Sequence, residues 1–210
     1  MNSRTTPPGP PAAVAGRSEA PLLNIANALT VVRLVLVPVF IWLMFRSGDA
    51  VRLVAALVFA LAAATDRLDG QLARSRNLVT SFGKIADPIA DKALTLSAFV
   101  LLSVAGRLWW WVTVLIIVRE LGITLMRFVM LRRAVMAASR GGKLKTALQV
   151  TGIFGLLVPW AAFVPPVLAT ALDLAAYALV GSALVVTLVT GADYVLEALR
   201  LSRADPGGRP

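Results

Sequence analysis

The chain contains no cysteine and no histidine among its 210 residues. Without cysteine no disulfide can form, although this absence says little about the cellular compartment. A typical zinc site would also lack its preferred ligands, because those are cysteine sulfur and histidine nitrogen. Any metal bound by this chain is therefore expected to be a cation that prefers oxygen ligands.

Charged residues are also scarce. They make up 15% of the chain, whereas hydrophobic residues make up 58%, and the mean hydropathy is +0.79. This composition is typical of an integral membrane protein, and the length favours one domain. The formal net charge of +10 would suit nucleic acid, but the basic residues are confined to short segments between apolar runs. That distribution fits anionic membrane lipid better, and no nucleic-acid partner is expected.

Apolar runs recur along the chain, and a bilayer span needs about 20 residues. They predict an all-α, polytopic membrane protein with six transmembrane helices. The spans are expected near residues 29–46, 51–72, 86–106, 108–131, 146–165 and 172–199. Lysine and arginine gather in the N-terminal tail, between spans two and three, between spans four and five, and after the last span. Both termini are therefore predicted on the cytoplasmic side of the cell (inner or plasma) membrane.

The two ends of the chain are predicted to lie outside the transmembrane domain, which is expected over residues 22–200. Residues 1–21 are rich in proline, alanine and glycine, which indicates a disordered tail and not a signal peptide. Residues 201–210 are predicted to form a flexible C-terminal tail.

A polar stripe marks the entrance to the first span, where Asn24, Asn27, Thr30 and Arg33 recur every three residues. One interpretation is an N-terminal amphipathic juxtamembrane helix that leads into the first span. The other is an ordinary span whose polar entrance is solvated.

Aspartates interrupt the apolar pattern between the second and third spans. Asp66, Asp69, Gly70 and Ala73 fall at i, i+3, i+4 and i+7, which is one face of a helix, and Arg74 follows directly. Small residues on the same face as the acids would let a ligand lie against the helix backbone.

A second stripe follows on what would be the next helix, because Gly83, Asp87 and Asp91 are spaced by four. The two carboxylate pairs can therefore face each other. Each would cost about 2.5–3.5 kcal/mol inside an apolar bundle, so a cation is expected between them. Carboxylate oxygens suit Mg²⁺, Mn²⁺ or Ca²⁺, and Mg²⁺ usually keeps positions open for water and substrate phosphate.

A second constellation is basic. Arg119 and Arg127 are eight residues apart and share a helix face. The glycines of residues 141–142 are expected to break the chain before Lys143 and Lys145, which predicts a mobile basic loop. Such a loop beside a carboxylate site would suit a second, anionic substrate.

Two alternatives remain open for these cations. Arg119 either is compensated locally by its neighbour Glu120 or faces a polar cavity, as intramembrane charges usually do. Arg132, Arg133 and Arg140 fit charges that only set the membrane topology.

The aspartate pattern D-x2-D-G-x2-A-R-x8-G-x3-D-x3-D, from Asp66 to Asp91, resembles the signature of the CDP-alcohol phosphatidyltransferase family, with every position filled. The resemblance covers about residues 24–199. It implies that two Mg²⁺ or Mn²⁺ ions bind to Asp66, Asp69, Asp87 and Asp91, with Asp91 as the catalytic base. Binding of the CDP-lipid would involve Asp69, Gly70, Ala73, Arg74 and Gly83, together with Asn27, Thr30 and Arg33 at the entrance.

Within the family, the segments VREL and GGKLKTALQ are similar to the subgroup that makes phosphatidylglycerophosphate. This likeness implies transfer from CDP-diacylglycerol to glycerol 3-phosphate by direct in-line attack, and a homodimer in membrane lipid. The acceptor phosphate would bind to Arg119, Arg127, Lys143 and Lys145. The GKxKT element is less specific than the aspartate signature.

Other functions also remain open. An inositol phosphate acceptor would want the same kind of basic pocket, and a phospholipid acceptor could use the basic loop too. A divalent-cation transporter is the alternative from another class, since intramembrane carboxylates also mark ion pathways. The chain has no evident internal repeat, however, and its acids lie at the membrane mouth and not at the midplane where transporters commonly bind ions.

Overall fold

The computed structural model describes residues 25–75, 81–130 and 140–204. These residues form six long α-helices and one short 3₁₀ turn, and no strand occurs within these ranges. The six helices are α1 (Ile25–Met44), α2 (Asp49–Ser75), α3 (Ser81–Val104), α4 (Trp110–Met130), α5 (Arg140–Leu157) and α6 (Pro166–Ala204), with the 3₁₀ turn η1 (Trp160–Ala162) before α6. The prediction of an all-helical chain with six helices is confirmed.

Two glycines with positive φ allow tight connections between helices. Gly48 (φ 110°) lies between α1 and α2, and Gly106 (φ 68°) follows α3. At Gly106 the backbone N–H donates to the Ser103 carbonyl at 3.1 Å, and the Arg107 N–H donates to the Leu102 carbonyl at 2.8 Å. These bonds form a Schellman motif, in which glycine adopts the left-handed conformation at low cost.

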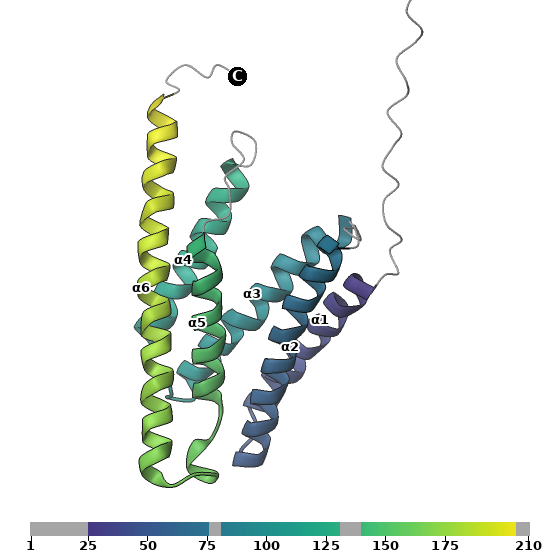
Figure 1. Cartoon of the computed structure of the whole chain (residues 1–210), viewed down its shortest axis with the longest axis vertical. Helices are drawn as coiled ribbons and strands as arrows, with labels where there is room; N and C mark the ends of the chain where they lie inside the picture. The colour runs from purple at the N-terminus through teal and green to yellow at the C-terminus, as the bar shows by residue number, and fades with distance from the viewer. Residues whose placement is uncertain (1–24, 76–80, 131–139, 205–210) are drawn as a thin grey trace, which may run out of the picture.

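The helices form two groups of three that pack against each other (Figure 1). α1 packs on α2 and α3, and α6 packs on α4 and α5; α2 and α3 also contact α5, and α3 contacts α4. The α1–α2 and α5–α6 connections lie at one end of the bundle. The C-terminal ends of α2, α4 and α6 and the start of α3 lie toward the other (Figure 1).

Small residues allow α5 and α6 to pack closely. A Cβ atom added at Gly152 would lie 2.8 Å from Val180 Cγ2 and 3.0 Å from the Val180 backbone nitrogen. A Cβ atom at Gly155 would lie 2.7 Å from Ala176 Cβ. Neither contact is possible without movement, so glycine is required for this helix spacing.

In the first half of α1, polar side chains face the interior of the bundle and apolar side chains face outward. Thr30 and Arg33 are buried, at 1% and 0% exposure, whereas Val31, Val32 and Val35 are 46–58% exposed. One stretch among the described residues, the 27 residues Pro166–Ala192 of α6, is long and apolar enough to cross a membrane, with a mean hydropathy of 2.0 over an 18-residue window. The apolar parts of α1 and α5, Ala28–Met44 and Leu144–Leu157, are shorter.

The N-terminal end of the fold differs from one of the two interpretations. α1 is one continuous helix from Ile25, so no separate amphipathic helix precedes the span within the described residues. The polar positions Thr30 and Arg33 are explained by burial within the bundle. The predicted tail over residues 1–21 lies outside the described residues, as do residues 205–210.

The prediction of a basic loop at residues 140–145 is wrong, because this segment is the start of α5. The glycines at 141–142 occupy the first turn of the helix. There the backbone N–H groups have no partner within the helix, so glycine disturbs little. At its other end, α5 stops at Leu157 before Pro159, and α6 begins at Pro166, because proline is favoured in the first turn of a helix.

Candidate active site

An ion pair between α1 and α2 holds the first signature aspartate. Arg33 Nη1 lies 2.6 Å from Asp66 Oδ1, and the Arg33 side chain is fully buried while that of Asp66 is 35% exposed. Thr30, one turn before Arg33, is also buried. α1 therefore supplies a buried cation that fixes one predicted metal ligand at a partly open position.

Asp91, on α3, is the other signature aspartate with a described side chain. It is partly buried, and its backbone carbonyl accepts a hydrogen bond from Thr95 Oγ1 at 3.0 Å. The carboxylates of Asp66 and Asp91 are near enough to repel each other, and Arg33 attracts Asp91. One acid from α2 and one from α3 are therefore within range of electrostatic interaction, and the facing of the complete pairs stays a prediction.

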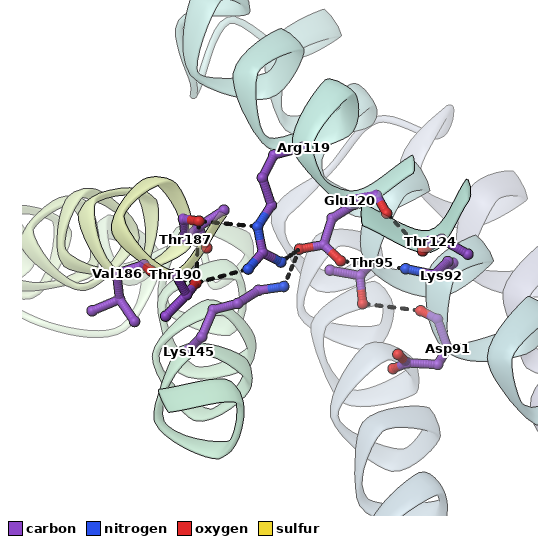
Figure 2. A network of polar contacts seen from close by, with 10 residues as sticks. All are labelled: Asp91, Lys92, Thr95, Arg119, Glu120, Thr124, Lys145, Val186, Thr187 and Thr190. Atoms are coloured by element: carbon purple, nitrogen blue, oxygen red, sulfur yellow. Dashed lines mark hydrogen bonds and ion pairs between the residues drawn. The ribbon is translucent and has the colours of Figure 1, made fainter. Parts of the chain in front are cut away.

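A cluster of cations surrounds Glu120 of α4 next to Asp91 (Figure 2). Lys92 Nζ donates to Glu120 Oε2 at 3.3 Å, and Arg119 Nη1 donates to Oε1 at 3.2 Å. Lys145 Nζ, from α5, also contacts Oε1. We refer to Lys92, Arg119, Glu120 and Lys145 as the Glu120 cluster. Its members come from three helices, so it joins both halves of the bundle.

Arg119 reaches across to α6 (Figure 2). Its Nε donates to the Thr187 carbonyl at 2.9 Å, and its Nη2 donates to Thr190 Oγ1 at 2.7 Å. The side chain passes Gly191, where an added Cβ would lie 3.4 Å from Arg119 Cγ and Nε. The first alternative for Arg119 is thus realised, because it pairs with Glu120, and its other donor groups bind α6.

Asp91 and the two lysines of the Glu120 cluster line the same small cavity. Its lining residues come from α3, α4 and α5. They are Asp91, Lys92, Thr95, Leu96, Glu120, Lys145, Thr146, Gln149 and Val150. One carboxylate with a predicted catalytic role therefore shares a cavity with two lysine ammonium groups.

The remaining predicted residues lie in helices, but their side chains are outside the described part of the structure. α2 contains Asp69, Gly70, Ala73 and Arg74, and α3 contains Gly83 and Asp87. Asn27 lies in α1, Arg127 in α4 and Lys143 in α5. Their predicted roles stay predictions.

The residues present fit a hard divalent cation in the chemistry of their donors. Asp66 and Asp91 supply carboxylate oxygens, which Mg²⁺ and Mn²⁺ prefer. Among the residues with described side chains, no three acids, histidines or cysteines gather at one point. Asp69 and Asp87, which would complete the predicted set, lie outside those residues.

Lys92 and Gln149 line the cavity but were not predicted as site residues, and Glu120 was predicted only as a possible local partner of Arg119. The available signal for Lys92 was its position directly after a signature aspartate. Glu120 is separated from Lys92 and Lys145 by 28 and 25 positions, respectively, so no helical spacing could relate them.

A separate polar pair lies on residues far from the signature. Arg107 Nη2 binds Asp173 Oδ1 at 2.7 Å, and the Tyr177 hydroxyl donates to the Arg107 carbonyl at 2.7 Å. These contacts join the α3–α4 connection to α6 and involve none of the predicted site residues.

A helical bundle that sets an aspartate beside a cluster of cations is suited to substrates that carry phosphate groups. The chain belongs to the CDP-alcohol phosphatidyltransferase family, whose profile matches residues 23–192. The expectation drawn from the aspartate signature is confirmed.

The chain is also similar to individual proteins whose names specify one activity within the family. The chain is 50% identical over 190 residues to a protein named probable phosphatidylglycerophosphate synthase from Mycobacterium tuberculosis (strain H37Rv), covering 89% of this chain and 86% of that protein. It is 35% identical over 150 residues to the CDP-diacylglycerol–glycerol-3-phosphate 3-phosphatidyltransferase of Bacillus subtilis, covering 65% and 78%. The Rickettsia typhi protein of the same name is 39% identical over 136 residues, covering 64% and 76%.

Proposed function

We propose that this enzyme transfers the phosphatidyl group from CDP-diacylglycerol to glycerol 3-phosphate, forming phosphatidylglycerophosphate and CMP. The relatives' names support this activity. The observation that carries the proposal is the cavity in which Asp91 lies with Lys92 and Lys145. A group that can accept a proton and groups that can bind a phosphate thus line one space.

The donor lipid is assigned to α1, α2 and α3. Asp66, Asp69, Asp87 and Asp91 would hold two Mg²⁺ or Mn²⁺ ions. Bound metal would neutralise the diphosphate and the charge that develops on the CMP leaving group. Arg33 supports this arrangement, since it holds Asp66 in place.

Further residues would position the donor. Arg74 adds a fixed cation for the same phosphates, and Gly70, Ala73 and Gly83 let the nucleotide approach the helices. Asn27 and Thr30 border the same region from α1.

The reaction is an in-line displacement at the β-phosphorus. The glycerol hydroxyl oxygen forms a new bond to this phosphorus while the bond between the phosphorus and the CMP oxygen breaks. Asp91 accepts the hydroxyl proton, and CMP leaves with the electron pair. No serine, cysteine or histidine nucleophile is apparent in the sequence, so direct attack is simpler than a covalent intermediate.

The acceptor phosphate is assigned to Lys145, with Arg119, Arg127 and Lys143 as further cations. Lys145 has the strongest support, because it lines the cavity and is 8% exposed. Arg119 lies in the same cluster but also binds α6, so it is expected to act partly by holding Glu120 and α6 together.

The site is placed at the cytoplasmic face of a multi-pass protein of the inner or plasma membrane. The outward apolar face of α1 and the apolar stretch Pro166–Ala192 support the membrane location, and the distribution of lysine and arginine supports the orientation. Both termini would be cytoplasmic, and residues 22–200 would form the transmembrane domain of a homodimer. A water-soluble acceptor could then reach the cavity while the acyl chains stay in lipid.

The test is release of CMP by purified protein given CDP-diacylglycerol and Mg²⁺, with glycerol 3-phosphate or inositol phosphate as the acceptor. We expect release with glycerol 3-phosphate, loss on addition of EDTA, and recovery with excess Mg²⁺. Release with inositol phosphate alone would overturn the assignment of the acceptor but keep the roles of the aspartates. Metal flux in proteoliposomes without CMP release would indicate transport.

A further inference from the structure

Glu120 lies at the centre of the Glu120 cluster, yet no step of the proposed reaction uses it (Figure 2). Its Oε1 contacts Lys145 and Arg119, and its Oε2 contacts Lys92. The side chain is 14% exposed. One largely buried carboxylate therefore holds cations from three helices beside the cavity.

The charges of the cluster do not balance. Three cations surround one carboxylate, which leaves two positive charges in excess within the cluster. A phosphate monoester carries about −1.5 to −2 near neutral pH. The cluster therefore matches the charge of a phosphate monoester. Asp91 is the other acid in the lining, and its negative charge is assigned to the proposed metal site.

Donor groups also remain after the contacts with Glu120 are counted. A lysine ammonium has three N–H groups, and among the described residues Lys92 and Lys145 each have one hydrogen-bond partner, Glu120. Gln149 is 3% exposed and lines the same cavity, and its Nε2 has no hydrogen-bond partner among the described residues. Two ammonium groups and a buried amide can thus still donate.

We infer that Glu120 is a positioning residue for the acceptor phosphate. It holds Lys92 and Lys145, which come from different helices, close together with their remaining N–H groups available to the phosphate. Gln149 adds a donor from α5. Without the carboxylate the two ammonium groups repel, and the phosphate would have to bring them together itself, which costs affinity. The inference rests on the proposed function, because it assigns the cavity to that reaction's acceptor.

The experiment compares Glu120→Gln with the wild-type enzyme in steady-state kinetics and in thermal unfolding in detergent. We expect the KM for glycerol 3-phosphate to rise about tenfold or more, since hydrogen bonds with charged groups are involved. The KM for CDP-diacylglycerol should change little. At a fixed concentration, glycerol 3-phosphate should raise the unfolding temperature less than it does for the wild type, whereas the effect of CDP-diacylglycerol with Mg²⁺ should be unchanged. Glu120→Asp should restore part of the acceptor affinity.

Asp173→Asn is the matched control, because it replaces a carboxylate that also binds an arginine but lies outside the cavity. It should leave both KM values near those of the wild type. The inference is overturned if Glu120→Gln leaves the KM for glycerol 3-phosphate unchanged or raises both KM values equally. A lower KM would also overturn it, because Glu120 would then compete with the phosphate.

If Glu120→Gln does not fold, Lys92→Gln is used to test the inference with the same kinetic measurements. A selective rise in the acceptor KM supports the inference, and an unchanged acceptor KM overturns it. Failure of the proposed function is distinguishable, because the wild-type enzyme would then release CMP with inositol phosphate but not with glycerol 3-phosphate. The variants are in that case compared with inositol phosphate, whose phosphate would use the same donors.

Discussion

Asp91 is the residue on which the proposed chemistry depends most. It lies on α3, near the Asp66 carboxylate and at the edge of the cavity that Lys145 lines. A base that acts only on the acceptor can be separated from a group that binds the donor, because its loss should affect turnover more than binding.

For Asp91→Asn we expect turnover to fall at least about 100-fold, the usual contribution of a positioned acid or base. Binding of CDP-diacylglycerol with Mg²⁺ should be largely retained. The measurement pairs CMP release with binding of labelled CDP-diacylglycerol, and Asp173→Asn serves as the control. Equal loss of binding and turnover would instead make Asp91 chiefly a metal ligand.

For single residues, the sequence was most informative where the spacing of residues along one helix was enough to predict their positions. Helical periodicity placed Asp66 and Asp91 on single faces of successive helices and predicted that these faces meet, and the two carboxylates lie within range of electrostatic repulsion. The ion pair between Arg33 and Asp66 was not predicted, although Arg33 was named as a candidate residue for binding the CDP-lipid. Contacts between residues of different helices, such as Lys92 with Glu120, depend on packing that no local pattern encodes.

At the scale of elements, the packing of α5 on α6 determines where Lys145 and Gln149 lie relative to α6. Gly152 and Gly155 permit the close approach of these helices. Gly181, on α6, has no heavy atom of another part of the chain within 4 Å of an added Cβ. Gly152 and Gly181 therefore form a matched pair for comparison. Both lie in helices, but only Gly152 is closely packed against another helix.

Gly152→Ala is expected to destabilise the protein by about 1–3 kcal/mol, because the new methyl group would press on the backbone of Val180. Gly181→Ala should be neutral or stabilising by up to about 1 kcal/mol, because alanine favours the helix. Thermal unfolding of both variants in the same detergent checks this. Equal unfolding temperatures for the two variants would contradict the packing described here.

Helix existence was easier to predict than helix boundaries. Long apolar runs predicted all six helices, but α5 begins at Arg140 and not near residue 146. The error came from treating glycines 141–142 as a break, whereas the first turn of a helix tolerates them. The C-terminal boundary of α5 lies just before Pro159, and α6 begins at Pro166.

At the scale of the whole molecule, the proposed reaction requires one end of the bundle to face the cytoplasm. The α1–α2 and α5–α6 connections lie at the end away from the C-terminal end of α6 (Figure 1). Because the chain has no cysteine, single cysteines can be introduced without a background signal.

Ser47→Cys and Phe163→Cys, in the two connections, should react with a membrane-impermeant maleimide in intact spheroplasts. Ser202→Cys, near the end of α6, should react only after the membrane is permeabilised. Mass-tag shifts on gels report the reaction. The reverse pattern would place the site on the outer face, and reaction of all three in intact spheroplasts would argue against a membrane-spanning bundle.

The central claim is that this bundle joins a phosphatidyl group to glycerol 3-phosphate. The most direct measurement is mass spectrometry of the lipid formed by purified protein from CDP-diacylglycerol, Mg²⁺ and isotopically labelled glycerol 3-phosphate. We expect labelled phosphatidylglycerophosphate in equal amount to the CMP released, and at least about 100-fold slower product formation by Asp91→Asn. CMP without labelled lipid, or a lipid product from inositol phosphate only, would contradict it.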